Sequence, residues 1–356
     1  MITGDQVTTA KAVAEQVGLL CEGSPVVRAR DLPQDEAILG AMLDHDGVVI
    51  AAVSPEDKLR IARSLRARGH VVAMTGDGVN DGPALREANI GIAMGKTGTD
   101  VAREAADLVL LDDAFPTIVA AVEEGRATFA NVRRFLTYHL TDNVAELAPF
   151  VVWALSGGRF PLALSILQVL SLDLGTDMLP AVALGAEPPR SGLLDRPPEK
   201  HHILDRGVLV RAFGLLGPTE AVIELFAFLV TFWVAGWRAG SSFPSGKLLL
   251  AASGAAFAAV VLGQMANAFA CRSTRYSPAR LGWMTNRLLT FAVILEVLLL
   301  FLFFAVPQLA SILHHQWPSM AGALSALTAI PAVFLVDFLY KHWARHTISP
   351  SLPQPR

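Results

Sequence analysis

The pattern of hydrophobic and polar positions changes character near residue 113. In residues 1–113, short apolar runs of strand length alternate with segments whose apolar residues recur at helical spacing. Beyond Phe135 the apolar residues merge into spans that approach the ~20 residues needed to cross a bilayer. The pattern therefore predicts an α/β domain followed by an all-α polytopic membrane domain.

Strands that alternate with helices in the first region predict βαβ units and a parallel sheet. Met1 and Ile2 would end a first strand. Ser54 is placed to cap the helix that follows, and Gly69 to end it. The expected helices are 8–20, 33–43, 55–68, 83–88 and 99–105, and the expected buried strands are 48–53, 70–74, 90–94 and 107–111.

The second region predicts one long helix and several further spans. Residues 115–140 keep helical spacing without a break and continue into the apolar stretch 144–155, as a stalk that enters a membrane would. The further spans are 161–185, 208–236, 247–270, 288–306 and 319–340. This makes about six crossings, with both ends on one side. The expected division is 1–113 for the α/β domain, 114–135 for the stalk, 136–343 for the membrane domain and 344–356 for the tail.

Loop charge predicts the orientation of the spans. Basic residues gather in two loops and the tail: Arg190, Arg196, Lys200, Arg206, Arg272, Arg275, Arg280, Arg287, Lys341, Arg345 and Arg356. The opposite loops hold only Arg159, Arg238 and Lys247. Because cytoplasmic loops carry an excess of Lys and Arg, the α/β domain and the tail are expected in the cytoplasm. We expect the plasma membrane as the location.

Composition excludes some classes of protein. The chain has 356 residues, 53% of them hydrophobic, and a net charge of -3, with a mean hydropathy of +0.45. Because the net charge is slightly negative, the chain has no overall positive charge that would favour nucleic acid as a partner. The two cysteines, Cys21 and Cys271, lie far apart, so we interpret both as reduced and exclude a disulfide scaffold.

The turn after the apolar run 70–74 carries candidate chemistry. The strand ends in Thr75-Gly76-Asp77-Gly78, at the edge where open α/β sheets bind ligands. Glycine allows the backbone to approach a ligand closely. Asp77 and Asp81 are hard oxygen ligands suited to Mg²⁺ beside a phosphate. The alternative is an acidic loop after a core strand, with no further role.

Polar residues inside the apolar spans form a second candidate site, because ionisable groups at membrane depth are costly and usually functional. Asn143 and Glu146 share one helix face, and Asp173, Thr176 and Asp177 share another. Pro149 and Pro180 lack the N–H groups that would bond the carbonyls of Ala145 and Thr176. Together these oxygens would form a cage for a hard cation. The alternative is a polar cluster that fastens helices together.

Other polar residues in the spans allow the same two interpretations. Gln264, Asn267 and Glu296 are placed as accessory ion ligands or as interhelical hydrogen-bonding groups. We count Gln264 with the transported-cation ligands and name the set Asn143, Glu146, Asp173, Thr176, Asp177 and Gln264 the cation cage. Glu220 and Glu224 are interpreted as structural, and Asp337 as interfacial.

Several segments together resemble the P-type ATPases, cation pumps that phosphorylate themselves on aspartate. The sequence T-G-D-G-V-N-D at 75–81 resembles their hinge motif. Residues 1–5 and 54–58 resemble further motifs of their phosphorylation domain, and residues 143–146 and 173–180 resemble their ion-binding helices. The closest likeness is to the calcium and sodium/potassium pump branch. The resemblance implies a partial Rossmann-like α/β domain of the haloacid dehalogenase type.

The resemblance also implies roles for individual residues. Asp77 would hold Mg²⁺, Asn80 and Asp81 would order the loop and the phosphoryl group, and Lys58 would neutralise phosphate oxygens. The remaining phosphate-binding residues would be Thr3, Gly4, Asp5, Thr75 and Gly76. Without the family, Lys58 reads equally well as an exposed helix lysine and Thr3 as part of a frayed terminus.

The resemblance covers only part of such a pump. The segments D-K-T-G-T and T-G-E-S and the large nucleotide-binding insertion do not occur in this sequence. We therefore expect a C-terminal portion, with ATP as a cofactor of the complete pump, an inactive chain when alone, and a missing N-terminal part as a further partner. Asp173 with Gly175 resembles the sodium/potassium pump, whereas Asn143 with Glu146 resembles the calcium pump. Calcium is slightly favoured, and sodium, potassium and protons stay open.

Two rival interpretations belong to other classes. A soluble-type phosphatase fused to a membrane anchor predicts no polar cage in the helices, and the sequence contains one. A non-catalytic membrane fragment or regulatory remnant is compatible with the missing phosphorylation segment.

Overall fold

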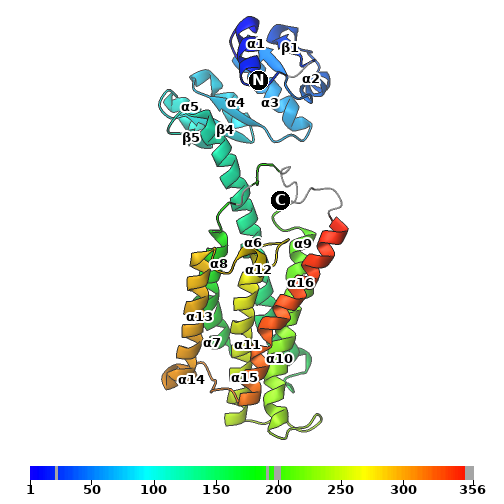
Figure 1. Cartoon of the computed structure of the whole chain (residues 1–356), viewed down its shortest axis with the longest axis vertical. Helices are drawn as coiled ribbons and strands as arrows, with labels where there is room; N and C mark the ends of the chain where they lie inside the picture. Colours follow the sequence, from blue (N-terminus) through cyan, green and yellow to red (C-terminus); the bar gives the residue numbers. More distant parts are fainter. Residues whose placement is uncertain (21–22, 190–191, 196–201, 349–356) are drawn as a thin grey trace. The chain divides into compact units, whose positions relative to one another are not determined.

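The computed structural model describes residues 1–20, 23–189, 192–195 and 202–348 (Figure 1). The chain folds as two compact units, Met1–Val122 and Glu123–Arg356. Five residues used above lie outside the described part of the chain: Cys21, Arg190, Arg196, Lys200 and Arg356. The other cysteine, Cys271, is free and buried, as predicted.

The first unit is an α/β fold with parallel pairing throughout its described strands. Its helices are α1 (Val7–Gln16), α2 (Glu36–Leu43), α3 (Pro55–Ala67), α4 (Gly82–Glu87) and α5 (Asp100–Ala105). Its strands are β1 (Val26–Arg28), β2 (Val49–Ala51), β3 (Ala73–Gly76), β4 (Ile90–Met94) and β5 (Leu108–Leu110). One sheet pairs β1 with β2, and the other has the order β3-β4-β5. The predicted parallel α/β class is confirmed.

Two strands differ from the prediction for local reasons. The strand β1 was not predicted, because its apolar run contains only Val26 and Val27 before a charged residue. The predicted strand 70–74 begins later, at Ala73, since Val71 is 80% exposed and the amide of Val72 bonds the Asn89 side chain at 2.9 Å instead of a strand partner.

The helix caps follow the sequence. Ser54 and Asp57 form a reciprocal capping box at the start of α3. Gly69, at φ +84°, lies just past the end of α3, where glycine adopts this conformation without strain. Ile2 bridges Ile50 in parallel and packs against the hydrophobic clusters on both sides of α3.

The second unit is built from helices, the first of which begins in the last residues of the first unit. They are α6 (Phe115–Leu155), α7 (Ile166–Ser171), α8 (Met178–Gly185), α9 (Arg206–Leu209), α10 (Gly217–Val234), α11 (Lys247–Cys271), α12 (Pro278–Leu281), α13 (Arg287–Ala305), α14 (Pro307–Ile312), α15 (Met320–Leu327) and α16 (Ala329–Ile348). Two π-helical turns interrupt them, η3 (Leu172–Asp177) and η4 (Val210–Leu216). Such turns are rare and occur frequently at functional sites.

Within the described residues, five stretches are long and apolar enough to cross a membrane: Ile166–Gly185, Arg206–Val234, Lys247–Cys271, Arg287–Ala305 and Met320–Ala344. They agree closely with the five predicted spans that follow the stalk helix. The sixth predicted crossing, in the second half of α6, is helical but is not among them. The mean hydropathy of this stretch is lowered by three polar residues, Asp142, Asn143 and Glu146.

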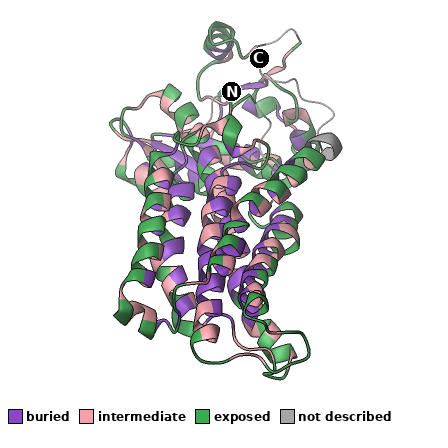
Figure 2. Ribbon diagram, turned by 60° about the horizontal axis from the view of Figure 1, so that its bottom comes forward, coloured by how far each residue is buried: buried purple, intermediate pink, exposed green. Residues whose placement is uncertain are grey.

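The helix α11 forms the centre of the second unit. It packs against α10, α15 and α16, and 72% of its apolar stretch is buried, against 22% for α13. Its many alanines allow the neighbouring helices to approach closely. Residues that line the interior alternate with outward-facing exposed ones along the surrounding helices (Figure 2).

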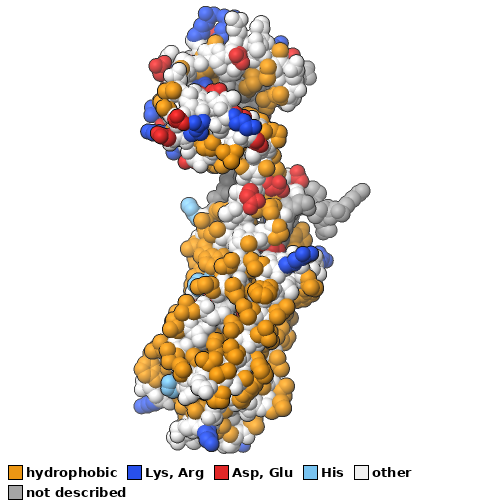
Figure 3. All heavy atoms as spheres, turned by 90° about the vertical axis from the view of Figure 1, so that its left-hand side faces the viewer, with side chains coloured by type: hydrophobic (Ala, Val, Ile, Leu, Met, Phe, Trp, Pro, Cys, Tyr) orange, Lys and Arg blue, Asp and Glu red, His pale blue; other side chains and the backbone are white. Residues whose placement is uncertain are grey.

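The outward faces of these helices are apolar. On α13, Phe291, Ile294, Leu298 and Phe301 are all more than half exposed. Hydrophobic side chains spread over the helical unit in the space-filling view, with few charged groups among them (Figure 3). Apolar surface of this extent is expected where helices face lipid. The chain is a multi-pass membrane protein.

Candidate functional site

The candidate phosphate site in the first unit centres on the ion pair between Lys58 and Asp81. Lys58 Nζ lies 2.6 Å from Asp81 Oδ1. The other carboxylate oxygen, Oδ2, accepts from the backbone N–H groups of Asp77 at 3.3 Å and Gly78 at 3.2 Å. The turn that follows β3 is therefore closed by Asp81 and tied to α3 by Lys58.

These contacts stabilise the ionised form of the Asp81 carboxylate. Burial alone would raise its pKa, but the hydrogen bonds from Lys58 and the Gly78 amide outweigh burial, and the pKa lies below its ordinary value of 3.8. Gly76 is needed beside it, because a Cβ on Gly76 would lie 2.5 Å from the Cβ of Asp81. The conformation of the turn thus depends on a glycine and an ionised carboxylate.

The other predicted residues of this site are more open. Asp77 and Asn80 are exposed, and Thr75 is half-buried at the end of β3. The backbone carbonyl of Asp77 accepts from the Thr99 amide at 2.9 Å. The side chains of Asp77 and Asn80 are therefore both accessible to a ligand from solvent.

The N-terminal residues are held against β2. The Thr3 amide donates to the Ile50 carbonyl at 3.0 Å, and the Val53 amide donates to the Thr3 carbonyl at 3.1 Å. The Thr3 hydroxyl donates to Asp5 Oδ2 at 3.0 Å. Gly4 and Asp5 are exposed. Since β2 leads directly to the capped helix that carries Lys58, this segment and the turn at Asp81 belong to one connected region.

The candidate cation site in the second unit contains a buried chain of hydrogen bonds across three elements. Gln264 Nε2 of α11 donates to Glu146 Oε1 of α6 at 3.2 Å. The Thr176 hydroxyl of η3 donates to Gln264 Oε1 at 3.2 Å and to the Leu172 carbonyl at 3.1 Å. All three side chains are at most 2% exposed. The structure therefore brings together three residues of the predicted cation cage.

Asp177 lies on the same π turn and makes a different contact. Its Oδ2 lies 2.7 Å from His139 Nδ1 of α6, and its buried Oδ1 has no hydrogen-bond partner among the described residues. Asp173 and Asn143 are half-buried. A buried carboxylate oxygen without a partner has coordination capacity left for a ligand.

Sequence reasoning missed His139 and Asp142 of α6. Asp142 is 1% exposed, and its Oδ1 accepts from Asn267 Nδ2 of α11 at 2.9 Å. Both residues stand at helical spacing from Glu146, His139 seven and Asp142 four positions before it. That spacing was a usable signal for a continuous polar face on this helix.

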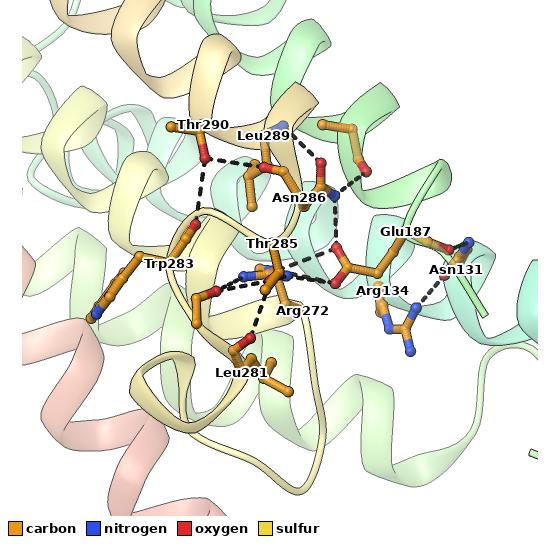
Figure 4. Close-up of polar contacts among 12 residues, drawn as sticks. Asn131, Arg134, Glu187, Arg272, Leu281, Trp283, Thr285, Asn286, Leu289 and Thr290 are labelled. Carbon is orange, nitrogen blue, oxygen red and sulfur yellow. Dashed lines mark hydrogen bonds and ion pairs between the residues drawn. The ribbon is translucent and has the colours of Figure 1, made fainter. Parts of the chain in front are cut away.

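A second group of polar contacts, which we name the Glu187 clamp, joins the buried residues Asn131, Glu187, Arg272 and Asn286 to the exposed Thr285 (Figure 4). Arg272 Nη2 donates to Glu187 Oε1 at 2.7 Å and to the Thr285 hydroxyl at 2.6 Å. Asn286 Nδ2 donates to Glu187 Oε2 at 2.7 Å, and Asn131 Nδ2 donates to the Glu187 carbonyl at 2.7 Å. The clamp joins α6, the residues after α8, the end of α11 and the start of α13.

Arg272 was predicted only as a basic loop residue, yet it is 1% exposed. Asp337 was predicted as interfacial, and Lys341 as a basic residue of the cytoplasmic side. Both are buried instead: Asp337 Oδ1 lies 2.6 Å from Arg211 Nη2 and its other oxygen accepts from Lys341. Buried charges need partners. Arg211 and Asp337 lie far apart in the sequence, whereas Asp337 and Lys341 stand one helical turn apart on α16.

Comparisons with known proteins agree with this architecture. A haloacid dehalogenase-like hydrolase family matches residues 1–89, and the family described as cation transporting ATPase, C-terminus, matches residues 161–343. The first match defines the class of the α/β unit, and the second that of the helical unit. The chain belongs to the P-type cation-transporting ATPases and matches the C-terminal portion of that family.

Individual relatives support the same assignment. The chain is 36% identical to calcium-transporting ATPase 1 of Saccharomyces cerevisiae, over 97% of this chain and 35% of the relative. It is 37% identical to a calcium-transporting ATPase of Bacillus subtilis, over 95% of this chain and 37% of the relative. It is 39% identical to human sodium/potassium-transporting ATPase subunit alpha-4, over 67% of this chain and 26% of the relative. The chain thus spans between about a quarter and somewhat more than a third of the length of these relatives.

Proposed function

We propose that this chain carries the cation site and part of the phosphate site of a pump that moves an inorganic cation across a membrane through an aspartyl-phosphate cycle. The observation that carries the proposal is the buried hydrogen-bond chain from Glu146 through Gln264 to Thr176. It lies next to Asp177, which has an unpartnered buried oxygen. Groups of this kind at membrane depth are expected where an ion passes.

The donor set suits a hard cation. Glu146, Asp173 and Asp177 supply carboxylates, Thr176 a hydroxyl, and Asn143 and Gln264 amide oxygens. Pro149 lies inside α6 and Pro180 inside α8, so the carbonyls of Ala145 and Thr176 lack their usual partner four residues on. Three carboxylates in a low-dielectric site need a cation or protons to neutralise them. Calcium fits this charge slightly better than sodium, potassium or a proton.

The first unit supplies groups for phosphoryl transfer. Lys58 would neutralise phosphate oxygens, while Asp81 holds Lys58 and the 77–78 turn in place. Thr3, Gly4, Asp5, Thr75, Gly76 and Asn80 would position the phosphate group. The exposed carboxylate of Asp77 is of the donor type that Mg²⁺ prefers. Bound Mg²⁺ would neutralise charge on the phosphates of ATP.

The topology follows from the same proposal. The α/β unit and the tail would lie in the cytoplasm, where ATP is available, and the membrane would be the plasma membrane. The chain alone would release no phosphate from ATP, because the nucleophilic aspartate of the family's D-K-T-G-T segment is not in this sequence.

Cation binding by the chain itself tests the proposal. The chain is placed in lipid nanodiscs, and thermal unfolding is followed by tryptophan fluorescence with Ca²⁺, Mn²⁺, Na⁺ or K⁺. A ligand at one hundred times its Kd stabilises the folded state by about 2.7 kcal/mol. We expect one of these cations to raise the Tm of the wild type and to lose this effect in Glu146→Gln and Asp177→Asn.

Glu124→Gln is the matched control, because Glu124 is exposed on the same helix α6. It should keep the wild-type response. If all the variants keep the same half-saturating cation concentration as the wild type, the cation cage does not bind the ion. The polar residues would then serve only to fasten the helices together, as in a non-catalytic membrane fragment.

A further inference from the structure

Two glutamates of α10 have no place in the cation cage, although they lie as deep in the helical unit. Glu220 and Glu224 are 2% and 0% exposed. Their four carboxylate oxygens are all buried without a hydrogen-bond partner among the described residues. They stand four positions apart, so they share one face of the helix. Sequence analysis interpreted them as structural, but a fastening role requires hydrogen bonds that these carboxylates do not make.

Close packing fixes where this face points. A Cβ on Gly217 of α10 would lie 2.6 Å from the Cβ of Val144, so α10 touches α6 at this point. Glu220 follows one turn later. A Cβ on Gly263 of α11 would lie 3.2 Å from the Cγ of Glu220. The absence of a side chain at Gly263 therefore gives Glu220 its space at the junction of α6, α10 and α11.

The surroundings of the two α10 glutamates differ from those of the acidic residues in α6 and η3. Glu146 accepts a hydrogen bond from Gln264, Asp142 from Asn267, and Asp177 pairs with His139. Each of these carboxylates therefore has an amide or imidazole group as its partner. In the described part of the chain Glu220 and Glu224 have no amide or basic donor. The polar neighbour of Glu220 is the carboxyl group of Asp142, which can donate only when it is itself protonated. An ionised carboxylate buried without a donor or a cation is strongly disfavoured. A proton neutralises such a group without any further ligand.

We propose that Glu220 and Glu224 form a proton-binding site on α10, separate from the cation cage. Its ligand is a proton. Each glutamate that binds a proton is a neutral carboxylic acid at neutral pH. If the proposed function holds, this site supplies the proton that moves against the transported cation. The proton-binding site itself does not depend on that function.

The charged groups around the pair explain how the two sites would influence each other. Asp142 and Glu146 face it from α6, and Asp177 from the π turn η3. The polar side chains of α11 near this junction, Gln264 and Asn267, are uncharged. Negative charge on the α6 and η3 groups favours protonation of the α10 pair, and a cation among them opposes it.

Isotope-edited infrared spectroscopy tests the protonation directly. The chain is labelled with ¹³C-carboxyl glutamate, placed in nanodiscs at neutral pH, and the C=O absorption of protonated glutamic acid is compared among variants. We expect Glu220→Gln and Glu224→Gln each to remove part of this band, and strongly alkaline pH to remove the same part from the wild type. An unchanged band in both variants would show ionised carboxylates and overturn the proposal.

Two glutamates serve as controls for the same substitution. Glu187→Gln removes a buried carboxylate that is paired with Arg272, and Glu124→Gln removes an exposed one. Both should leave the protonated band unchanged and reduce the carboxylate band.

A measurement on the wild type covers the case in which an α10 variant does not fold. Hydrophobic carbodiimides react with protonated carboxyl groups, and mass spectrometry locates the adduct. Modification at Glu220 or Glu224 supports the proposal. Modification that reaches Glu146 or Glu296 but neither α10 glutamate overturns it, because it shows that the reagent entered the helices. Neither readout needs ATP or a transported cation, so a failed cation test with an intact acid band would overturn the cation cage alone.

Discussion

The amide of Gln264 is held between two helices: its nitrogen donates to Glu146 at 3.2 Å, and its oxygen accepts from Thr176 at the same distance. The contact with Glu146 fixes the orientation of this amide, because turning it over would set its oxygen against a carboxylate oxygen. Gln264 therefore makes the relative positions of Glu146 and Thr176 depend on α11. A ligand that binds both residues would find them already in place.

Gln264→Leu should weaken the cation site and destabilise the helical unit. It leaves the buried carboxylate of Glu146 without its donor, at a cost of about 1–3 kcal/mol, while the Thr176 hydroxyl keeps the Leu172 carbonyl as its acceptor. We expect a lower Tm and a half-saturating cation concentration raised about tenfold, which corresponds to ~1.4 kcal/mol. Thermal unfolding in nanodiscs measures both. Gln308→Leu, at an exposed position of α14, is the control and should change neither.

Lys58→Met should destabilise the first unit. It removes the partner of Asp81, whose side chain is only 10% exposed, and hydrogen bonds to charged groups contribute about 1.5–3 kcal/mol. Urea unfolding followed by circular dichroism measures the loss. Lys11→Met is the control, since Lys11 forms only an exposed pair with Glu15 at 3.8 Å, which contributes about 0.3–0.5 kcal/mol. Equal effects of the two variants would contradict a structural role for the pair at Asp81.

Gly76→Ala should displace Asp81, because the added Cβ would stand 2.5 Å from the Cβ of that residue. Overpacking of this kind costs about 1–3 kcal/mol. Gly125→Ala, in the helix α6 where nothing lies within 4 Å, should instead stabilise the chain by up to about 1 kcal/mol. Opposite shifts of the unfolding midpoint are the expected result. If Gly76→Ala left the unfolding midpoint unchanged, the turn at 77–81 would be able to rearrange around the added methyl group.

The sequence predicted those features of the fold that depend on interactions between neighbouring residues. Residue spacing predicted the helix from Pro55, its Ser54 cap and its Gly69 stop, because these depend on a few neighbouring backbone groups. The five apolar spans were predicted within a few residues for most ends, since bilayer thickness sets their length. The strand β1, with only two apolar residues, carried too weak a pattern to be recognised.

The rest depends on contacts between distant segments. Sequence spacing grouped Glu146 with its helix and Thr176 with another, but the hydrogen bonds through Gln264 arise only when α11 packs between them. The partners of Arg272 lie at Glu187 and Thr285, and no local pattern connects these positions. A charge that reads as a solvated loop residue can therefore be buried, as Arg272 and Lys341 are.

The Glu187 clamp gives the chain an acid-sensitive contact. Burial alone would raise the pKa of Glu187, but the hydrogen bonds from Arg272 and Asn286 and the charge of Arg272 outweigh burial, and the pKa lies below its ordinary value of 4.5. A group whose pKa is depressed in the folded state adds stability above its unfolded pKa. That stability is lost as the pH falls through the folded pKa. The contribution of Glu187 is thus fully present at neutral pH and disappears in acid.

Glu187→Gln should lower the free energy of unfolding of the helical unit by about 3–5 kcal/mol at pH 7, because it leaves the Arg272 charge buried without its partner. The difference from the wild type should begin to shrink as the pH falls below 4.5, the ordinary pKa, and should be smallest below the depressed folded-state pKa, where the wild-type carboxylate is also neutral. Thermal unfolding in nanodiscs between pH 7 and acid measures this difference. Adding Arg272→Met to Glu187→Gln should recover part of the stability, since the unpaired charge is then gone. A difference that stays constant over the whole pH range would show that Glu187 is already neutral at pH 7 and that Arg272 is held by its other partners.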